Sequence, residues 1–240
     1  MLTTPLDCIL LIDIETVSQY PDYYGMPSHW QHLWDLKIDR QLSEGETPGE
    51  FYPKRAAILS EFGKIICISA GYFTNENGKN MLRVKSFFGH DESALLQSVI
   101  AAFNQWQQNK KVSAFCGHNI KEFDVPYLCR RLLVNGIPIP GYLDFQSMKP
   151  WDTNIIDTLQ LWKFGDFKNY TSLTLLAACM NVPSPKDDID GSQVGDVYWK
   201  ENNINRIAVY CQKDVITVAQ LVLRLKQLPL LEVNDIVLVD

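Results

Sequence analysis

Two carboxylates stand close together near the N-terminus, at the end of an apolar segment. In 9-ILLIDIETVSQY-20, one residue separates Asp13 from Glu15. Side chains alternate between the two faces of a β-strand, so both carboxylates point the same way and Ile14 points the other way. Two like charges 4 Å apart repel by roughly 4 kcal/mol at an effective dielectric constant near 20. The pattern therefore indicates a compensating cation, and a divalent metal ion is the obvious candidate.

Acidic residues at two other positions lie far along the chain. Asp124, in 117-GHNIKEFDVPYL-128, stands at the expected start of a helix, where the helix dipole favours a carboxylate. Tyr210 and Asp214 are four residues apart in the last expected helix, so they share one face of it. Each position has an ordinary structural explanation, a helix cap for Asp124 and a solvated acid beside the core for Asp214. Their combination with the first pair favours a shared functional site.

The three segments together resemble the three motifs of the DEDD 3′–5′ exonucleases. The matching residues are DIET in the first strand, GHNxxxFDxP at a helix start, and YxxxD in the last helix. The tyrosine of the third motif resembles the tyrosine subgroup, because the position where the histidine subgroup has its histidine is Val209. Within that subgroup, the chain is most similar to the proofreading exonuclease domain of family B DNA polymerases and its free-standing bacterial relatives. The resemblance covers roughly residues 8–225, and residues 20–62 do not match.

The resemblance implies an assignment for each acidic residue of the motifs. Asp13, Glu15, Asp124 and Asp214 would hold two divalent ions, Mg²⁺ or Mn²⁺. These hard cations prefer oxygen ligands, which agrees with a ligand set made only of Asp and Glu. Two such ions, about 3.5–4 Å apart, stabilise the attacking and leaving oxygens of phosphodiester hydrolysis. Tyr210 would orient the attacking water, since a phenol with a pKa near 10 is a poor base at pH 7.

Other residues near these motifs are candidates for substrate contacts. Phe123 could stack on the 3′-terminal base, an interaction of about 1–3 kcal/mol. A position in the hydrophobic core explains this aromatic residue equally well. Asn119 could donate to the sugar or phosphate, or it could simply be a turn residue. The backbone N–H of Thr16 could reach the terminal 3′-OH. Lys186 could meet a phosphate, but a solvated lysine is the commoner case, and His118 is interpreted as structural.

The elements that position these residues follow from hydrophobic periodicity and turn signals. They predict an α/β chain whose mixed five-stranded sheet is flanked by helices, and the resemblance implies a ribonuclease-H-like fold. The expected strands are 8–16, 64–73, 82–88, 112–117 and 154–157, with a hairpin turn at 74–80. The expected helices begin at Ser28 and at Pro53 (ending at Gly63), and span 92–108, 123–136, 158–164, 171–181 and 203–227.

We expect a single domain over residues 1–240, with residues 17–62 as an aromatic-rich, partly helical insertion. The insertion contains Trp30 and Trp34 at helical spacing, together with Tyr23 and Tyr24. These side chains could guide a nucleic-acid strand toward the site. An aromatic stripe at this spacing is more often part of a core.

Composition restricts the function less than the motifs do. The net charge of −6 argues against a nucleic-acid binder that works through a basic surface, but four acidic metal ligands would account for much of it (−6 + 4 = −2). We expect no membrane span, because no run of about 18 or more apolar residues is present. We also expect no signal peptide, because the N-terminus lacks a basic region followed by a clean apolar segment and a small-residue cleavage site. The six scattered cysteines form no CxxC pair and predict reduced thiols in a cytoplasmic protein.

The leading hypothesis is a metal-dependent 3′–5′ exonuclease that acts on single-stranded ends and releases nucleoside monophosphates. DNA is favoured over RNA because of the polymerase resemblance, and roles in trimming, repair or turnover follow, with or without a protein partner. The first alternative is a catalytically idle nucleic-acid-binding or assembly module on the same fold. The second is another metal-dependent hydrolase, such as a structure-specific endonuclease.

Overall fold

The computed structural model describes residues 2–110, 112–146, 148–149, 153–166, 169–183 and 189–239. Lys186 lies outside these ranges. Among the described helices, none combines the length and the apolar composition needed to cross a membrane.

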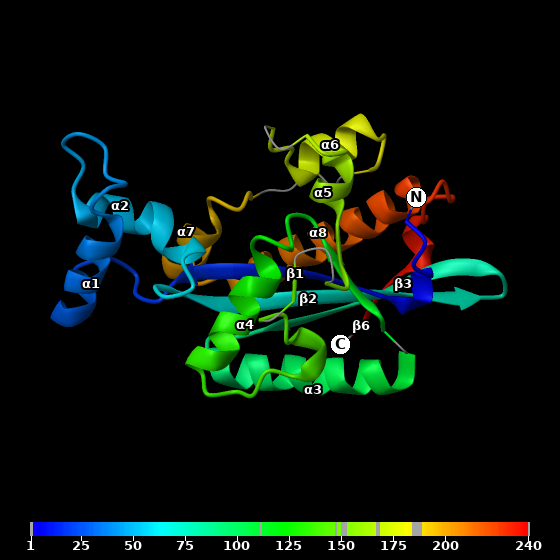
Figure 1. The fold of residues 1–240 in the computed structure, drawn as a ribbon, viewed down its shortest axis with the longest axis horizontal. Helices are drawn as coiled ribbons and strands as arrows, with labels where there is room; N and C mark the ends of the chain where they lie inside the picture. The colour runs from blue at the N-terminus through cyan, green and yellow to red at the C-terminus, as the bar shows by residue number, and fades with distance from the viewer. Residues whose placement is uncertain are drawn as a thin grey trace.

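A mixed sheet forms the centre of the molecule, with β1 (Ile9–Ser18) in its interior. β2 pairs with β1 in antiparallel fashion on one side, and β4 pairs with it in parallel on the other. The strand order is β5-β4-β1-β2-β3-β6 (Figure 1). The remaining bounds are β2 Gly63–Glu76, β3 Lys79–Phe88, β4 Ala114–Gly117, β5 Ile155–Asp157 and β6 Ile236–Val239.

The predicted mixed α/β architecture is confirmed, but the predicted number of strands was one too low. The sheet has six strands, because β6 adds to it in parallel beside β3. Its sequence, IVLV, lacks the apolar–polar alternation of a half-buried strand, and its last two residues are exposed. Its place in the sheet depends on pairing with β3, which lies more than 140 residues away in the chain.

Helices cover both faces of the sheet (Figure 1). α3 and α4 pack on one face, whereas α8 packs on the other with α5, α6 and α7 nearby. The helix bounds are α1 Ser28–Ile38, α2 Pro48–Arg55, α3 Glu92–Lys110, α4 Asp124–Val134, α5 Thr158–Lys163, α6 Leu173–Cys179, α7 Val194–Trp199 and α8 Ile204–Leu225.

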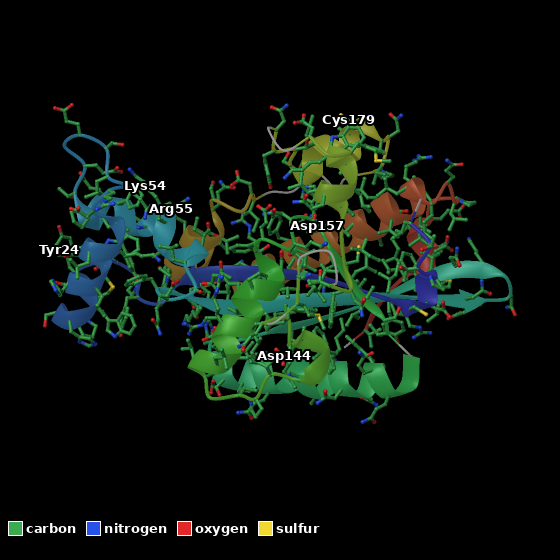
Figure 2. The ribbon with its side chains drawn as sticks, viewed as in Figure 1. Tyr24, Lys54, Arg55, Asp144, Asp157 and Cys179 are labelled. Carbon is green, nitrogen blue, oxygen red and sulfur yellow. The ribbon has the colours of Figure 1, made fainter. Side chains whose placement is uncertain are left out.

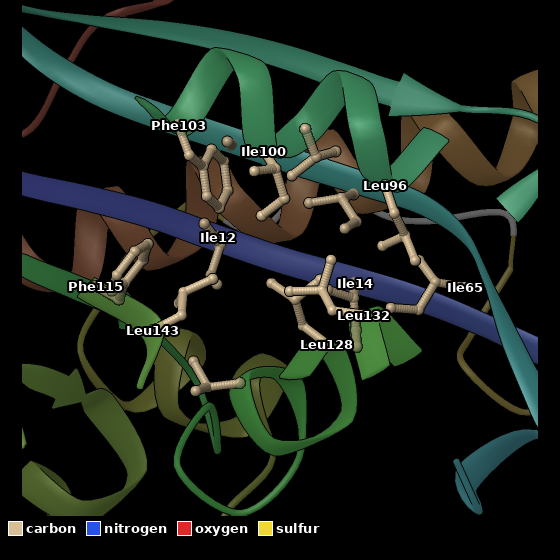
Figure 3. Close-up of a cluster of buried hydrophobic side chains, with 14 of the residues drawn as sticks. Ile12, Ile14, Ile65, Leu96, Ile100, Phe103, Phe115, Leu128, Leu132 and Leu143 are labelled. Atoms are coloured by element: carbon tan, nitrogen blue, oxygen red, sulfur yellow. The ribbon is translucent and has the colours of Figure 1, made fainter. Parts of the chain in front are cut away.

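The alternation along β1 decides which side chains face which helices. Ile12 and Ile14 are buried against the α3 and α4 face, where Leu128 of α4 is one of their neighbours (Figure 3). Leu11 joins the cluster formed with α8 on the opposite face. Because Asp13 and Glu15 alternate with these isoleucines, their carboxylates are directed to the α8 face.

The hairpin between β2 and β3 is tighter than predicted. Its strands continue to Glu76 and Lys79, which leaves only Asn77 and Gly78 as the turn. Both have positive φ angles, 53° and 83°, as a two-residue turn of the I′ type requires. Asn75 accepts a hydrogen bond from Gly78 N at 3.0 Å. The polar composition of residues 74–80 predicted a loop there. Five of these residues belong to the strands, because the two-residue turn keeps the strands paired up to Glu76 and Lys79.

The second helix of the insertion was placed wrongly. α2 begins at Pro48 and ends at Arg55, whereas the prediction ran from Pro53 to Gly63. Thr47 and Glu50 form a capping box, in which Thr47 Oγ1 accepts from Glu50 N (3.3 Å) and Glu50 Oε2 accepts from Thr47 N (2.9 Å). This cap and a proline in the first helical position define the start.

The aromatic residues of the insertion form a small core of their own. Trp34 is fully buried, and its ring centroid lies 5.0 Å from those of Tyr52 and Phe62. The core interpretation is therefore confirmed for Trp34, whereas Tyr24 is 79% exposed at the outer end of the insertion (Figure 2). α1 and α2 lie beyond the C-terminal end of β1 (Figure 1).

A buried ion pair joins the two helices on the α3 and α4 face. Arg131 of α4 and Glu92 of α3 are 3% and 8% exposed. Their two hydrogen bonds measure 2.9 Å (Nε to Oε1) and 2.6 Å (Nη2 to Oε2). Glu92 Oε1 also accepts from Ile65 N at 2.7 Å, beside the irregularity in the β1–β2 pairing. The pair therefore supports the strand that pairs with the acidic segment of β1.

We expect Arg131→Ala to lower the free energy of unfolding by about 3–5 kcal/mol, because Glu92 would be left as a buried, uncompensated charge. Urea denaturation would measure this loss. Lys200→Ala is the matched control, since its pair with Asp196 (2.9 Å) is exposed and should contribute less than about 1 kcal/mol. Equal losses for the two variants would contradict the expectation.

Candidate active site

The two carboxylates of β1 lie together, as their alternation predicts. One oxygen of Asp13, one of Glu15 and the Sγ of Cys211 all lie within 4.8 Å of one another. Glu15 is only 8% exposed. Cys211 belongs to α8 and donates its S–H to the backbone carbonyl of Asp13 at 3.4 Å. This contact packs the last long helix directly against the acidic segment of β1.

Asp124 reaches β1 beyond the point where the pairing of β1 with β4 ends. β4 pairs with β1 only as far as Leu11. Farther along β1, the backbone N–H of Ile14 donates to Asp124 Oδ1 at 3.1 Å. A buried N–H without an acceptor would be costly, so this bond stabilises the carboxylate beside the strand. Asp124 is 5% exposed and is the first residue of α4.

A glycine at the end of β4 makes this approach sterically feasible. A Cβ atom at Gly117 would lie 2.9 Å from both the carbonyl oxygen of Ile12 and the Cβ of Ile120. The chain therefore turns from β4 toward α4 in close contact with β1.

Tyr210 and Asp214 extend from α8 toward the same carboxylates. Burial raises the pKa of the Tyr210 phenol, and the charges of Asp214, Glu15 and Asp13 raise it further. The structure thus brings together, from three distant segments, all five residues that the motifs single out.

The electrostatics of the group are unfavourable as long as all four acids are ionised. Burial raises the pKa of Asp13 well above its ordinary value, and the charges of Asp214, Glu15 and Asp124 add to this. The pKa of Glu15 is raised in the same way, first by burial and then by Asp214. For Asp124, burial is again the largest cause, and its pKa rises from 3.8 to about 7.

The donor set fits divalent cations. Asp13 Oδ2 is a buried oxygen with no hydrogen-bond partner among the described residues, so it has a lone pair available to a cation. The remaining donors are carboxylate oxygens, which suit Mg²⁺ and Mn²⁺. Burial raises the pKa of the Cys211 thiol, so this group remains a neutral S–H donor to the strand.

The candidate substrate residues border this group. Asn119 has a φ of 61°, which confirms its turn conformation, and its Oδ1 is buried without a hydrogen-bond partner among the described residues. Phe123 is half-buried, with its ring centroid 5.3 Å from that of Tyr127, so it packs partly in the core. Thr16 follows Glu15 and is 8% exposed.

Two further residues that the sequence did not single out lie beside Asp124. Asp157, at the end of β5, is 2% exposed and lies close enough to contribute to the raised pKa of Asp124. Tyr170 is 67% exposed, and burial followed by the charges of Asp124 and Asp157 raises its pKa. The only sequence signal was the position of Asp157 before a helix, which indicates an ordinary cap. Tyr170 carries no signal at all.

His118 has the structural role expected of it. Its Nε2 contacts the carbonyl oxygen of Thr171 and its Nδ1 contacts Thr158 Oγ1, both at 2.9 Å. Burial lowers the pKa of the imidazole, which keeps this histidine neutral. Both ring nitrogens are therefore occupied within the fold.

Comparisons with known proteins agree with the motifs. Residues 58–229 match a family described as a predicted 3′–5′ exonuclease related to the exonuclease domain of PolB. This range contains Asp124, Tyr210 and Asp214 and begins after β1. No curated protein is similar enough to match.

Among solved structures, the chain is similar to the family B DNA polymerase of the hyperthermophilic archaeon Pyrobaculum calidifontis. The sequences are 16% identical, the TM-score is 0.49, and the similarity covers 90% of this chain and 24% of the polymerase. The chain thus corresponds to about a quarter of that polymerase's length. Because the family match covers well over half of its residues, the chain belongs to the family of predicted 3′–5′ exonucleases related to the exonuclease domain of PolB.

Proposed function

We propose that this protein is a metal-dependent 3′–5′ exonuclease that removes nucleoside monophosphates from single-stranded nucleic-acid ends, with DNA favoured over RNA. The observation that carries the proposal is the gathering of Asp13, Glu15, Asp124, Tyr210 and Asp214 at one place beside β1. Family membership supports the reaction and its direction. A cytoplasmic location and a role in DNA repair stay predictions.

The four carboxylates are the proposed ligands of two divalent ions, Mg²⁺ or Mn²⁺. When bound, such ions stabilise negative charge on the attacking and leaving oxygens of the phosphodiester. The unpartnered oxygen of Asp13 and the raised pKa values of Asp13, Glu15 and Asp124 support this assignment, because each indicates negative charge without compensation.

The remaining residues bind and orient the reactants. Tyr210 stays protonated at neutral pH, so its hydroxyl holds the attacking water by a hydrogen bond and does not act as a base. The buried Oδ1 of Asn119 has no hydrogen-bond partner in the part of the chain that the structure describes, which suits a sugar hydroxyl at the 3′ end. Phe123 offers the exposed part of its ring to the terminal base, and the Thr16 N–H is assigned to the terminal 3′-OH.

Digestion of 5′-labelled single-stranded DNA and RNA of one sequence tests this function. In Mg²⁺ or Mn²⁺, the wild-type protein should produce a descending ladder that EDTA abolishes. An Asp13→Ala/Glu15→Ala protein purified identically should produce none. If wild type and variant behave alike, the idle binding-module alternative is favoured. Internal fragments would instead indicate an endonuclease.

We expect Tyr210→Phe to lower kcat by about 100-fold with little change in KM, because it removes the hydroxyl that positions the water and keeps the ring. Steady-state kinetics on a single-stranded oligonucleotide would measure both constants. Tyr142→Phe is the control, since that hydroxyl bonds to Asn104 (2.8 Å) on the opposite face of the sheet. A kcat that is unchanged in Tyr210→Phe would remove this tyrosine from the mechanism.

A further inference from the structure

The carboxylate of Asp157 makes more hydrogen bonds than a helix cap needs. Asp157 lies where β5 leads into α5 (Figure 2). As the cap of α5, its Oδ1 accepts from Leu159 N at 2.9 Å and from Gln160 N at 3.3 Å. These two bonds satisfy the first turn of the helix, as an aspartate in this position ordinarily does.

The same carboxylate also holds the segment that follows β4. Its Oδ1 accepts from Asn119 N at 3.0 Å, and its Oδ2 accepts from Lys121 N at 3.1 Å. Four backbone N–H groups therefore converge on one side chain that is 2% exposed. Hydrogen bonds to a charged acceptor are stronger than neutral ones, and burial strengthens them further.

The segment held in this way carries the proposed site residues. Asn119 adopts a left-handed backbone conformation, with a φ of 61°, that only a few residue types tolerate. The chain then continues through Phe123 to Asp124. Thr158, next to Asp157, strengthens the attachment because its hydroxyl lies 2.9 Å from Nδ1 of His118, which belongs to the same segment.

We propose that Asp157 is a positioning residue for the exonuclease reaction, which holds the 119–121 turn so that Asn119 and Asp124 face the reacting end of the substrate. The inference rests on the proposed function. Asp157 acts through the backbone of the turn and has no contact with the substrate in this scheme. A displacement of about 1 Å in a positioning element can cost about 100-fold in rate.

Two substitutions separate the capping of α5 from the attachment of the turn. Asp157→Asn keeps one carbonyl oxygen for Leu159, Gln160 and Asn119, but places an amide N–H opposite the Lys121 N–H. Asp157→Ser keeps a hydroxyl that can cap α5 and is too short to reach the turn. Asparagine and serine cap helices about as well as aspartate does.

The experiment measures kcat and KM of each variant on a single-stranded DNA oligonucleotide in Mn²⁺, well below its melting temperature. We expect kcat to fall about 10-fold in Asp157→Asn and about 100-fold in Asp157→Ser, with a smaller change in KM. Thr47→Ala is the matched control, because it removes the cap of α2 in the insertion. Its melting temperature should fall while its kcat stays at the wild-type value.

The outcomes distinguish this inference from the proposed function. If the wild-type protein digests DNA and both Asp157 variants match its kcat, Asp157 is only a cap and the inference is wrong. If Asp157→Ser fails to fold, the kcat of Asp157→Asn alone decides between a positioning role and a simple cap. A wild-type protein without nuclease activity overturns the proposed function and this inference with it.

Discussion

Replacing Asp13 by asparagine is expected to abolish the proposed nuclease activity and, at the same time, to make the metal-free protein more stable. Activity should fall by at least about 1,000-fold, because a bound cation contributes several kcal/mol of charge stabilisation and each 1.4 kcal/mol is tenfold in rate. Stability should rise because the variant removes one negative charge from a buried group of four. Asp13 is the carboxylate whose pKa is raised by burial and by all three of the others.

The size of the stability gain follows from the repulsion removed. A single close pair of like charges costs roughly 4 kcal/mol at an effective dielectric constant near 20, and the acids already relieve part of this by taking up protons. We therefore expect a gain of about 1–3 kcal/mol in the free energy of unfolding at pH 8 with EDTA present. Urea denaturation measures the gain.

Asp196→Asn is the control for this experiment. Its carboxylate is exposed and pairs only with Lys200 among the described residues, so its removal should change stability by less than about 1 kcal/mol. A loss of stability in Asp13→Asn would mean that this carboxylate makes a stabilising contact in the metal-free protein. The metal assignment would then lose its main electrostatic support.

The second large effect is a stabilisation by Mn²⁺ that grows with pH. The pKa of Asp124 is about 7 in the folded protein, against 3.8 for an ordinary aspartate. Between these two values, the folded state binds more protons than the unfolded state does. The free energy of unfolding of the metal-free protein therefore decreases as pH rises through this window and levels off above about 7. For Asp124 alone, the decrease corresponds to about 4 kcal/mol.

Cations reverse this trend because they bind the ionised carboxylates of the folded state. The melting temperature should differ little with and without Mn²⁺ at pH 5, and the difference should become large at pH 8. Thermal melts at both pH values, in Mn²⁺ and in EDTA, measure it. Asp124→Asn should reduce the rise in melting temperature that Mn²⁺ causes at pH 8. If Mn²⁺ raises the melting temperature equally at pH 5 and at pH 8, the link between these carboxylates and metal binding is contradicted.

Local periodicity predicted the faces of the strand and helices on which the site residues lie, whereas their chemical roles came from the resemblance of the motifs. The alternation of Ile12, Asp13, Ile14 and Glu15 determines which side chains face α8, and strand geometry alone requires it. The four-residue spacing of Tyr210 and Asp214 places both on one face of a helix. The position of Asp124 at a helix start follows from a local preference of the same kind.

Contacts between distant segments decided the rest. Asp124 is held beside β1 by the N–H of Ile14, 110 positions earlier in the chain, and Cys211 donates to the Asp13 carbonyl across 198 positions. The two bonds from the 119–121 turn to Asp157 span 38 and 36 positions. A sequence pattern reports the face on which a side chain lies. Which backbone groups that side chain reaches depends on how the strands and helices pack against one another, and this packing is determined only in the folded chain.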